Sequence, residues 1–150
     1  MLTDLILAIL HHVLVFAIAG ILAAELVLVH PAMSSAQLKL VARLDLFYGI
    51  AAGLVVLVGF ARVFFSLKGP EFYLQNPVFW AKIGTFAIVG ILSIEPTLRF
   101  LKWRRLMTAD SNFFPSTDDL SSTRRYLKAE VHLFVLIPIF AAAMARGYGL

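Results

Sequence analysis

Residues 5–29 read LILAILHHVLVFAIAGILAAELVLV, and this stretch decides the fold. Its polar side chains are only His11, His12 and Glu25. A bilayer core roughly 30 Å thick needs about 20 consecutive apolar residues in a helix, and this run exceeds that length. It is also too long for the apolar region of a secretory signal, and Asp4 precedes it where a signal carries a basic residue. The stretch therefore predicts a retained membrane-spanning helix.

Three further apolar runs have the same character. Together the four predicted spans cover about residues 5–30, 38–67, 77–101 and 126–146. None alternates with a period of two, and only helices and closed barrels satisfy their backbone hydrogen bonds in lipid. Short connections make neighbouring helices antiparallel. We therefore predict an all-α fold, an integral membrane four-helix up-down bundle, with residues 1–150 as a single transmembrane domain.

Proline and serine residues mark where these helices begin, end and bend. Pro77 is placed as the first residue of the third span, and Pro138 predicts a kink in the fourth. The one sizeable connection is predicted at about residues 102–125, and Ser121 or Ser122 is suited to cap the fourth span, because a serine hydroxyl accepts free amide hydrogens at a helix start.

Composition and charge restrict the class of protein. The chain is 61% hydrophobic and only 15% charged, which is outside the usual balance of a soluble domain. Its net charge of +4 comes from basic residues beside apolar runs, as anionic lipid requires, and not from a basic patch interleaved with aromatic residues. We expect membrane lipid and no nucleic acid as a partner. The absence of cysteine excludes disulfides, thiolate metal sites and cysteine nucleophiles.

The distribution of Lys and Arg predicts the orientation. Basic residues concentrate at the first connection and around the long one: Lys39, Arg43, Arg99, Lys102, Arg104, Arg105, Arg124, Arg125 and Lys128. The positive-inside rule places these connections in the cytoplasm. A multi-pass protein with both termini in the periplasm is expected.

Ionisable residues inside the spans are the candidates for function, because each one is costly in lipid. Antiparallel register gathers eight polar or charged residues at the cytoplasmic level: Glu25, His30, Arg43, Asp45, Tyr48, Glu95, Glu130 and His132. Ion pairs explain part of this group, with Arg43 reaching Glu25 and Arg99 lying four residues after Glu95. The functional alternative is a proton or ligand site that contains Asp45, Glu130 and His132.

The opposite level gathers His11, His12, Arg62, Tyr73 and Lys82. Since His11 and His12 are adjacent, one of them faces the bundle if the other faces lipid. An inward imidazole beside apolar and aromatic side chains suits haem b, with Lys82 or an open position opposite it, because no second histidine lies at this level. An interfacial polar pair is the alternative. No spacing typical of a zinc site occurs, so no metal site is predicted.

A small-xxx-small face is formed by Gly49 and Gly53 in the second span. Such a face allows close approach of helix backbones. It predicts tight packing or a homodimer.

Three stretches carry a resemblance to a known family. They are the histidine pair His11 and His12, RLDLFYG at residues 43–49, and KGPEFYLQNPVFWAKIGTFAIVGILSIEPTLRFLKWRR at residues 68–105. The chain resembles the bacterial membrane-protein family called domain of unknown function 2214. This resemblance implies four spans in a bacterial inner membrane.

A more distant similarity is to the HemJ-type protoporphyrinogen oxidases and the CopD proteins, helical membrane bundles in which histidines bind haem or metal. His11 or His12 would match their first-helix histidine, and WAK at residues 80–82 resembles their HAK, with Trp80 in place of the histidine. The leading hypothesis is thus a haem- or porphyrin-linked redox role through His11, His12 and Lys82. The alternatives are a small transporter or proton-coupled permease and a structural subunit without a ligand.

Overall fold

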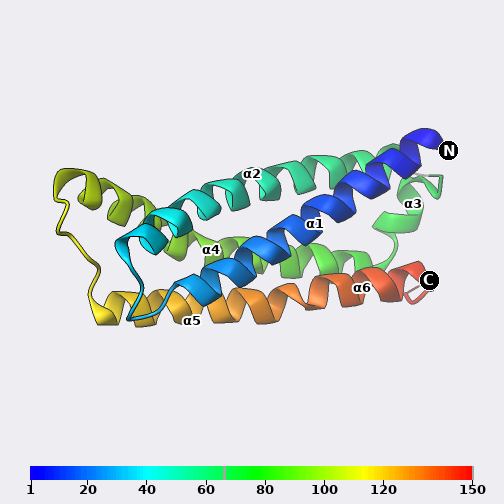
Figure 1. Cartoon of the computed structure of the whole chain (residues 1–150). Helices are drawn as coiled ribbons and strands as arrows, with labels where there is room; N and C mark the ends of the chain where they lie inside the picture. Colours follow the sequence, from blue (N-terminus) through cyan, green and yellow to red (C-terminus); the bar gives the residue numbers. More distant parts are fainter. Residues whose placement is uncertain (66, 150) are drawn as a thin grey trace.

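The computed structural model describes residues 1–65 and 67–149. The described chain is all-α, and four of its helical segments are long and apolar enough to cross a membrane: Leu2–Leu28, Ser35–Phe65, Pro77–Ala109 and Thr117–Ala145. They lie side by side along a common direction (Figure 1). The predicted all-α fold with four spans is confirmed.

The described residues form six helices: α1 (Leu2–Leu28), α2 (Ser35–Phe65), α3 (Gly69–Leu74), α4 (Pro77–Ala109), α5 (Thr117–Phe134) and α6 (Leu136–Ala145). Both termini and the short α3 lie at one end of the bundle, and the α4–α5 connection lies at the other (Figure 1). The predicted second span, 38–67, includes residue 66, which lies outside the described residues.

The helices at the charged end are longer than predicted. Helix α4 continues to Ala109 and α5 begins at Thr117, so the connection expected at 102–125 is reduced to residues 110–116. The basic residues mark where lipid ends, but the helices continue because both extensions bury apolar side chains in one cluster. This cluster includes Phe100 and Trp103 from α4 and Leu120 from α5.

The starts of α2, α4 and α5 have side-chain hydrogen-bonded caps. The Ser116 hydroxyl accepts the Asp119 amide hydrogen at 3.1 Å and donates to the Asp119 carboxylate at 2.9 Å. Ser116 therefore caps the fourth span. The prediction of Ser121 or Ser122 as the cap was wrong, because the helix begins more than one turn before these residues. Pro77 is the first residue of α4, as predicted, after an Asn76 cap.

The fourth span is divided into two helices that meet at Val135. Pro138 follows three residues later, where it lacks an amide hydrogen and its ring conflicts with the carbonyl of Phe134, four residues earlier. This accounts for the interruption at Val135, whose backbone keeps helical angles, and a kink at Pro138 stays a prediction.

Gly49 and Gly53 lie on the exposed side of α2. A Cβ atom added at either position meets no atom within 4 Å. The close approach of helices predicted for this face therefore does not occur within the described chain. A homodimer through it stays a prediction.

Candidate functional site

The polar side chains inside the bundle lie at two levels, which an apolar layer separates. The layer is a cluster of buried residues from all the long helices: Ile18, Leu22, Tyr48, Ala51, Val55, Val89, Phe134 and Ile137. One polar level lies on the side of this layer toward the termini, and the other lies toward the charged end. Each level is a candidate site.

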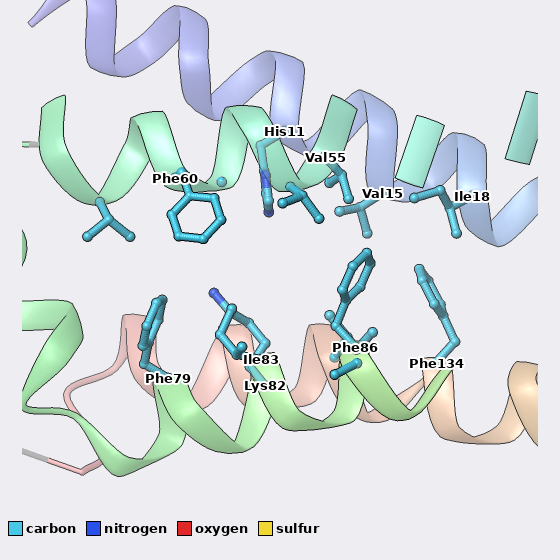
Figure 2. Close-up of a pocket in the computed structure, with 15 residues that line it drawn as sticks. His11, Val15, Ile18, Val55, Phe60, Phe79, Lys82, Ile83, Phe86 and Phe134 are labelled. Carbon is cyan, nitrogen blue, oxygen red and sulfur yellow. The ribbon is translucent and has the colours of Figure 1, made fainter. Parts of the chain in front are cut away.

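The first level is a pocket of about 310 Å³. Its lining comes from α1, α2, α4, α5 and α6: His11, Val15, Ile18, Val55, Val56, Gly59, Phe60, Val63, Phe79, Lys82, Ile83, Phe86, Ala87, Phe134 and Ile137. Figure 2 shows the His11 imidazole and the Lys82 amine pointing toward one another from opposite walls, with Phe60, Phe79 and Phe86 around them. The pocket is thus an aromatic and aliphatic chamber with one imidazole and one amine.

The imidazole of His11 packs against α2 at Gly59. Its Nδ1 atom is buried and has no partner in the structure. Gly59 on α2 leaves room for the ring, since an added Cβ there would lie 3.4 Å from the imidazole Cε1. The charges of Arg62 and Lys82 lie near enough to interact with the ring electrostatically. The His11 imidazole therefore lines the pocket, while its unpartnered Nδ1 atom is covered by the chain.

The second level is a cluster of three carboxyl groups, Glu25 from α1, Asp45 from α2 and Glu130 from α5, and we call it the acid cluster. Glu25 is 2% exposed and Glu130 is 1% exposed. The three groups are close enough to interact electrostatically. The Asp45 carboxylate accepts a 2.7 Å hydrogen bond from the Thr97 hydroxyl of α4, whereas one oxygen each of Glu25 and Glu130 has no partner.

A family model described as "Predicted membrane protein (DUF2214)" matches residues 3–149, nearly the whole chain. The chain belongs to the DUF2214 family. The resemblance stated from the sequence is thereby confirmed, and the family description agrees with the four candidate spans. No curated protein and no solved structure matches the chain.

In this DUF2214 member, the two adjacent histidines have different surroundings. His11 faces the pocket with Lys82, as the sequence allowed for one of the pair. His12 is exposed on the outside of α1, and its Nδ1 donates to the Ala8 carbonyl at 2.6 Å. The structure therefore brings together His11 and Lys82 of the three predicted cofactor residues.

The other predicted site residues of the DUF2214 chain lie outside the acid cluster. Arg43 is exposed and does not pair with Glu25. His132 is exposed, and its Nδ1 donates to the Lys128 carbonyl at 2.6 Å. Glu95 forms the predicted ion pair with Arg99, with 2.8 Å between carboxylate and guanidinium. Of the residues predicted for this proton or ligand site, the structure thus brings Asp45, Glu130 and Glu25 close together.

Sequence reasoning missed two contributors to these sites, Gly59 and Thr97, whereas it placed Arg62 at the level of His11 and Lys82. Gly59 and Arg62 follow Val55 at helical spacing, and this pattern is a signal that all three share one face of α2. Thr97 carries no such signal, because a threonine in an apolar helix commonly bonds its own backbone. Among the residues that the structure describes, no three His, Asp or Glu side chains are arranged to hold a metal ion.

Proposed function

We propose that this membrane protein binds a haem or porphyrin in the His11 pocket and has a redox role. The observation that carries the proposal is the His11 imidazole, which points into a cavity walled by aromatic and aliphatic side chains. Haem iron in proteins is commonly held by one axial imidazole within an apolar pocket. The residues at this position supply that donor and that environment.

The remaining polar groups of the pocket also suit such a ligand. Lys82 lies opposite His11, where its amine is available as a second ligand or as a cation for an acidic substituent of the ring. The charge of Arg62 lies near both residues. When bound, a haem would supply one-electron chemistry. The chain itself would supply the axial base, the apolar walls and compensation of negative charge.

The size of the pocket limits how a haem or porphyrin could enter it. A volume of about 310 Å³ is at the small end of the range of ligand pockets, roughly 300–1,000 Å³. A macrocycle therefore requires side chains at the rim to move. Phe60 lines the pocket and is 63% exposed, so it is the residue whose displacement costs least contact with the chain.

The experiment that tests this proposal is the visible spectrum of the protein purified in detergent, before and after addition of haemin. We expect a Soret band for the unaltered chain and for His12→Ala, whose histidine is exposed. We expect the band to be lost or strongly shifted in His11→Ala. His12→Ala is a matched control because it removes the same group from the neighbouring position.

Two results would contradict the haem proposal. One is a colourless preparation that takes up no haemin. The other is an equal loss of absorbance in His11→Ala and His12→Ala, which would indicate adventitious binding to histidine.

We infer a second candidate function from the acid cluster, a small proton-coupled transporter. Carboxylates buried without cationic partners cost several kcal/mol each, so a chain retains them where the charge has a use. Glu25 and Glu130 each have an unpartnered oxygen beside Asp45. A group that takes up and releases protons fits this arrangement. Uptake of protons into vesicles that contain the protein tests it, with Glu130→Gln expected to abolish uptake.

We further propose a multi-pass protein of a bacterial inner membrane with both termini in the periplasm. The support is the concentration of basic side chains at the end of the bundle opposite the termini, where Lys39, Arg43 and Arg104 are exposed. On this proposal the His11 pocket opens nearer the periplasm and the acid cluster lies nearer the cytoplasm.

A further inference from the structure

A groove runs between α2 and α4 at the charged end of the bundle. Its volume is about 460 Å³, and it is lined by Lys39, Arg43, Leu46, Arg104, Met107 and Thr108. The residues from α2 lie at helical spacing on one face, and so do those from α4. The groove is therefore lined by two facing rows of side chains, one from each helix. Each row contains at least one basic side chain and an apolar one.

The three cations of this groove have no acidic partner. Within residues 1–65 and 67–149, neither Lys39 nor Arg43 nor Arg104 forms an ion pair. The ion pair of α4 lies elsewhere and joins Arg99 to Glu95. Three like charges around one concave surface repel each other unless an anion lies between them. The groove thus has the charge of an anion site.

The apolar residues indicate which kind of anion fits. Leu46 is half-exposed and continues the stripe of Lys39 and Arg43 toward the middle of α2, where Ile50 is exposed as well. A phosphate bound between the cations would leave an attached acyl chain free to lie along these residues. Basic pockets between helices near a membrane surface bind anionic lipid head groups for this reason.

We infer that the groove lined by Lys39, Arg43 and Arg104 binds the head group of an anionic phospholipid. The phosphate contacts the two guanidinium groups and the amine; Thr108 lies at the same wall, where its hydroxyl donates to the Arg104 carbonyl at 3.0 Å. One acyl chain follows Leu46 and Ile50. This site is separate from the His11 pocket and from the acid cluster.

Native mass spectrometry of the whole chain in detergent tests the site. The probes are phosphatidylglycerol and phosphatidylcholine with identical acyl chains. We expect a one-to-one complex with phosphatidylglycerol that the variant Lys39→Gln/Arg43→Gln/Arg104→Gln weakens about a hundredfold, because each basic residue near a membrane surface contributes a factor of about five. Phosphatidylcholine is expected to bind weakly to both proteins.

The matched control is Lys102→Gln/Arg105→Gln/Lys128→Gln, which removes the same charge from exposed positions outside the groove. Unchanged unfolding temperatures of both variants show that each remains folded. The inference is overturned if the control loses phosphatidylglycerol equally, or if phosphatidylcholine binds as tightly. Displacement of the lipid by an equal concentration of inorganic phosphate or of an acidic peptide would also overturn it in favour of a soluble anion.

Discussion

His11 and Glu25 lie on the same face of α1, fourteen residues apart, so that one lines the pocket and the other belongs to the acid cluster. At about 1.5 Å per residue, the two are separated by about 21 Å along the helix. Ile18 and Leu22 fill the interval on this face and are fully buried. One helix therefore connects both candidate sites through an apolar segment.

The close approach of Gly59 to His11 gives the first prediction. Gly59→Leu places a side chain in the space that the imidazole uses, because even a Cβ atom there lies 3.4 Å from the ring. We expect the haemin-induced Soret band to be lost while the helix content by circular dichroism is retained. Gly53→Leu is the control, since no atom lies within 4 Å of a Cβ at that position. Equal spectra for the two variants would exclude the pocket as the binding site.

The acid cluster predicts selective chemical labelling. Hydrophobic carbodiimides react with carboxyl groups that carry a proton in an apolar environment. We expect a single adduct on Glu25 or Glu130 by peptide mass spectrometry, and none in Glu25→Gln/Glu130→Gln. The exposed Glu71 at the bundle end is the internal reference and should remain unlabelled. Protection by sodium chloride at constant pH would indicate a sodium site and contradict proton exchange.

The Ser116 cap predicts a loss of stability. Ser116→Ala removes the hydroxyl that binds the Asp119 amide, and such caps contribute about 1 kcal/mol. We expect a lower unfolding temperature in detergent than for Ser121→Ala, which removes an exposed hydroxyl inside α5. If the two variants unfold at the same temperature, the cap does not stabilise the helix.

The orientation predicts the result of reporter fusions. Alkaline phosphatase, which is active in the periplasm, should be active when joined to the N-terminus or after residue 149, and inactive when inserted in the connection 110–116. Green fluorescent protein should give the opposite pattern. Activity of the phosphatase in the connection would reverse the proposed topology.

The sequence predicted the depth of each polar residue along the bundle better than the side of the helix on which its side chain lies. Antiparallel register correctly placed His11 near Lys82, and Glu25 near Asp45 and Glu130, because spans of similar length align their ends. The direction of a side chain depends on which neighbour packs against each helix face, and this cannot be deduced from one span. His132 consequently lies on the opposite side of α5 from Glu130.

Helix ends were the other point where the sequence fell short. The change from apolar to charged residues after Leu101 shows where lipid ends, but not where the helix ends. Trp103 of α4 and Leu120 of α5 are both buried in one hydrophobic cluster, which lies beyond the apolar spans. That contact depends on the fold, so no local pattern predicts it.

The interruption of the fourth span at Val135 gives its two halves separate mechanical behaviour. Backbone hydrogen bonds stiffen α5 and α6 individually, and the joint between them is where bending costs least. Ile137 of α6 belongs to the pocket wall, whereas Glu130 is on α5. A tilt of α6 would therefore change the volume of the chamber around His11 and leave the carboxyl groups on the charged side of the apolar layer in place.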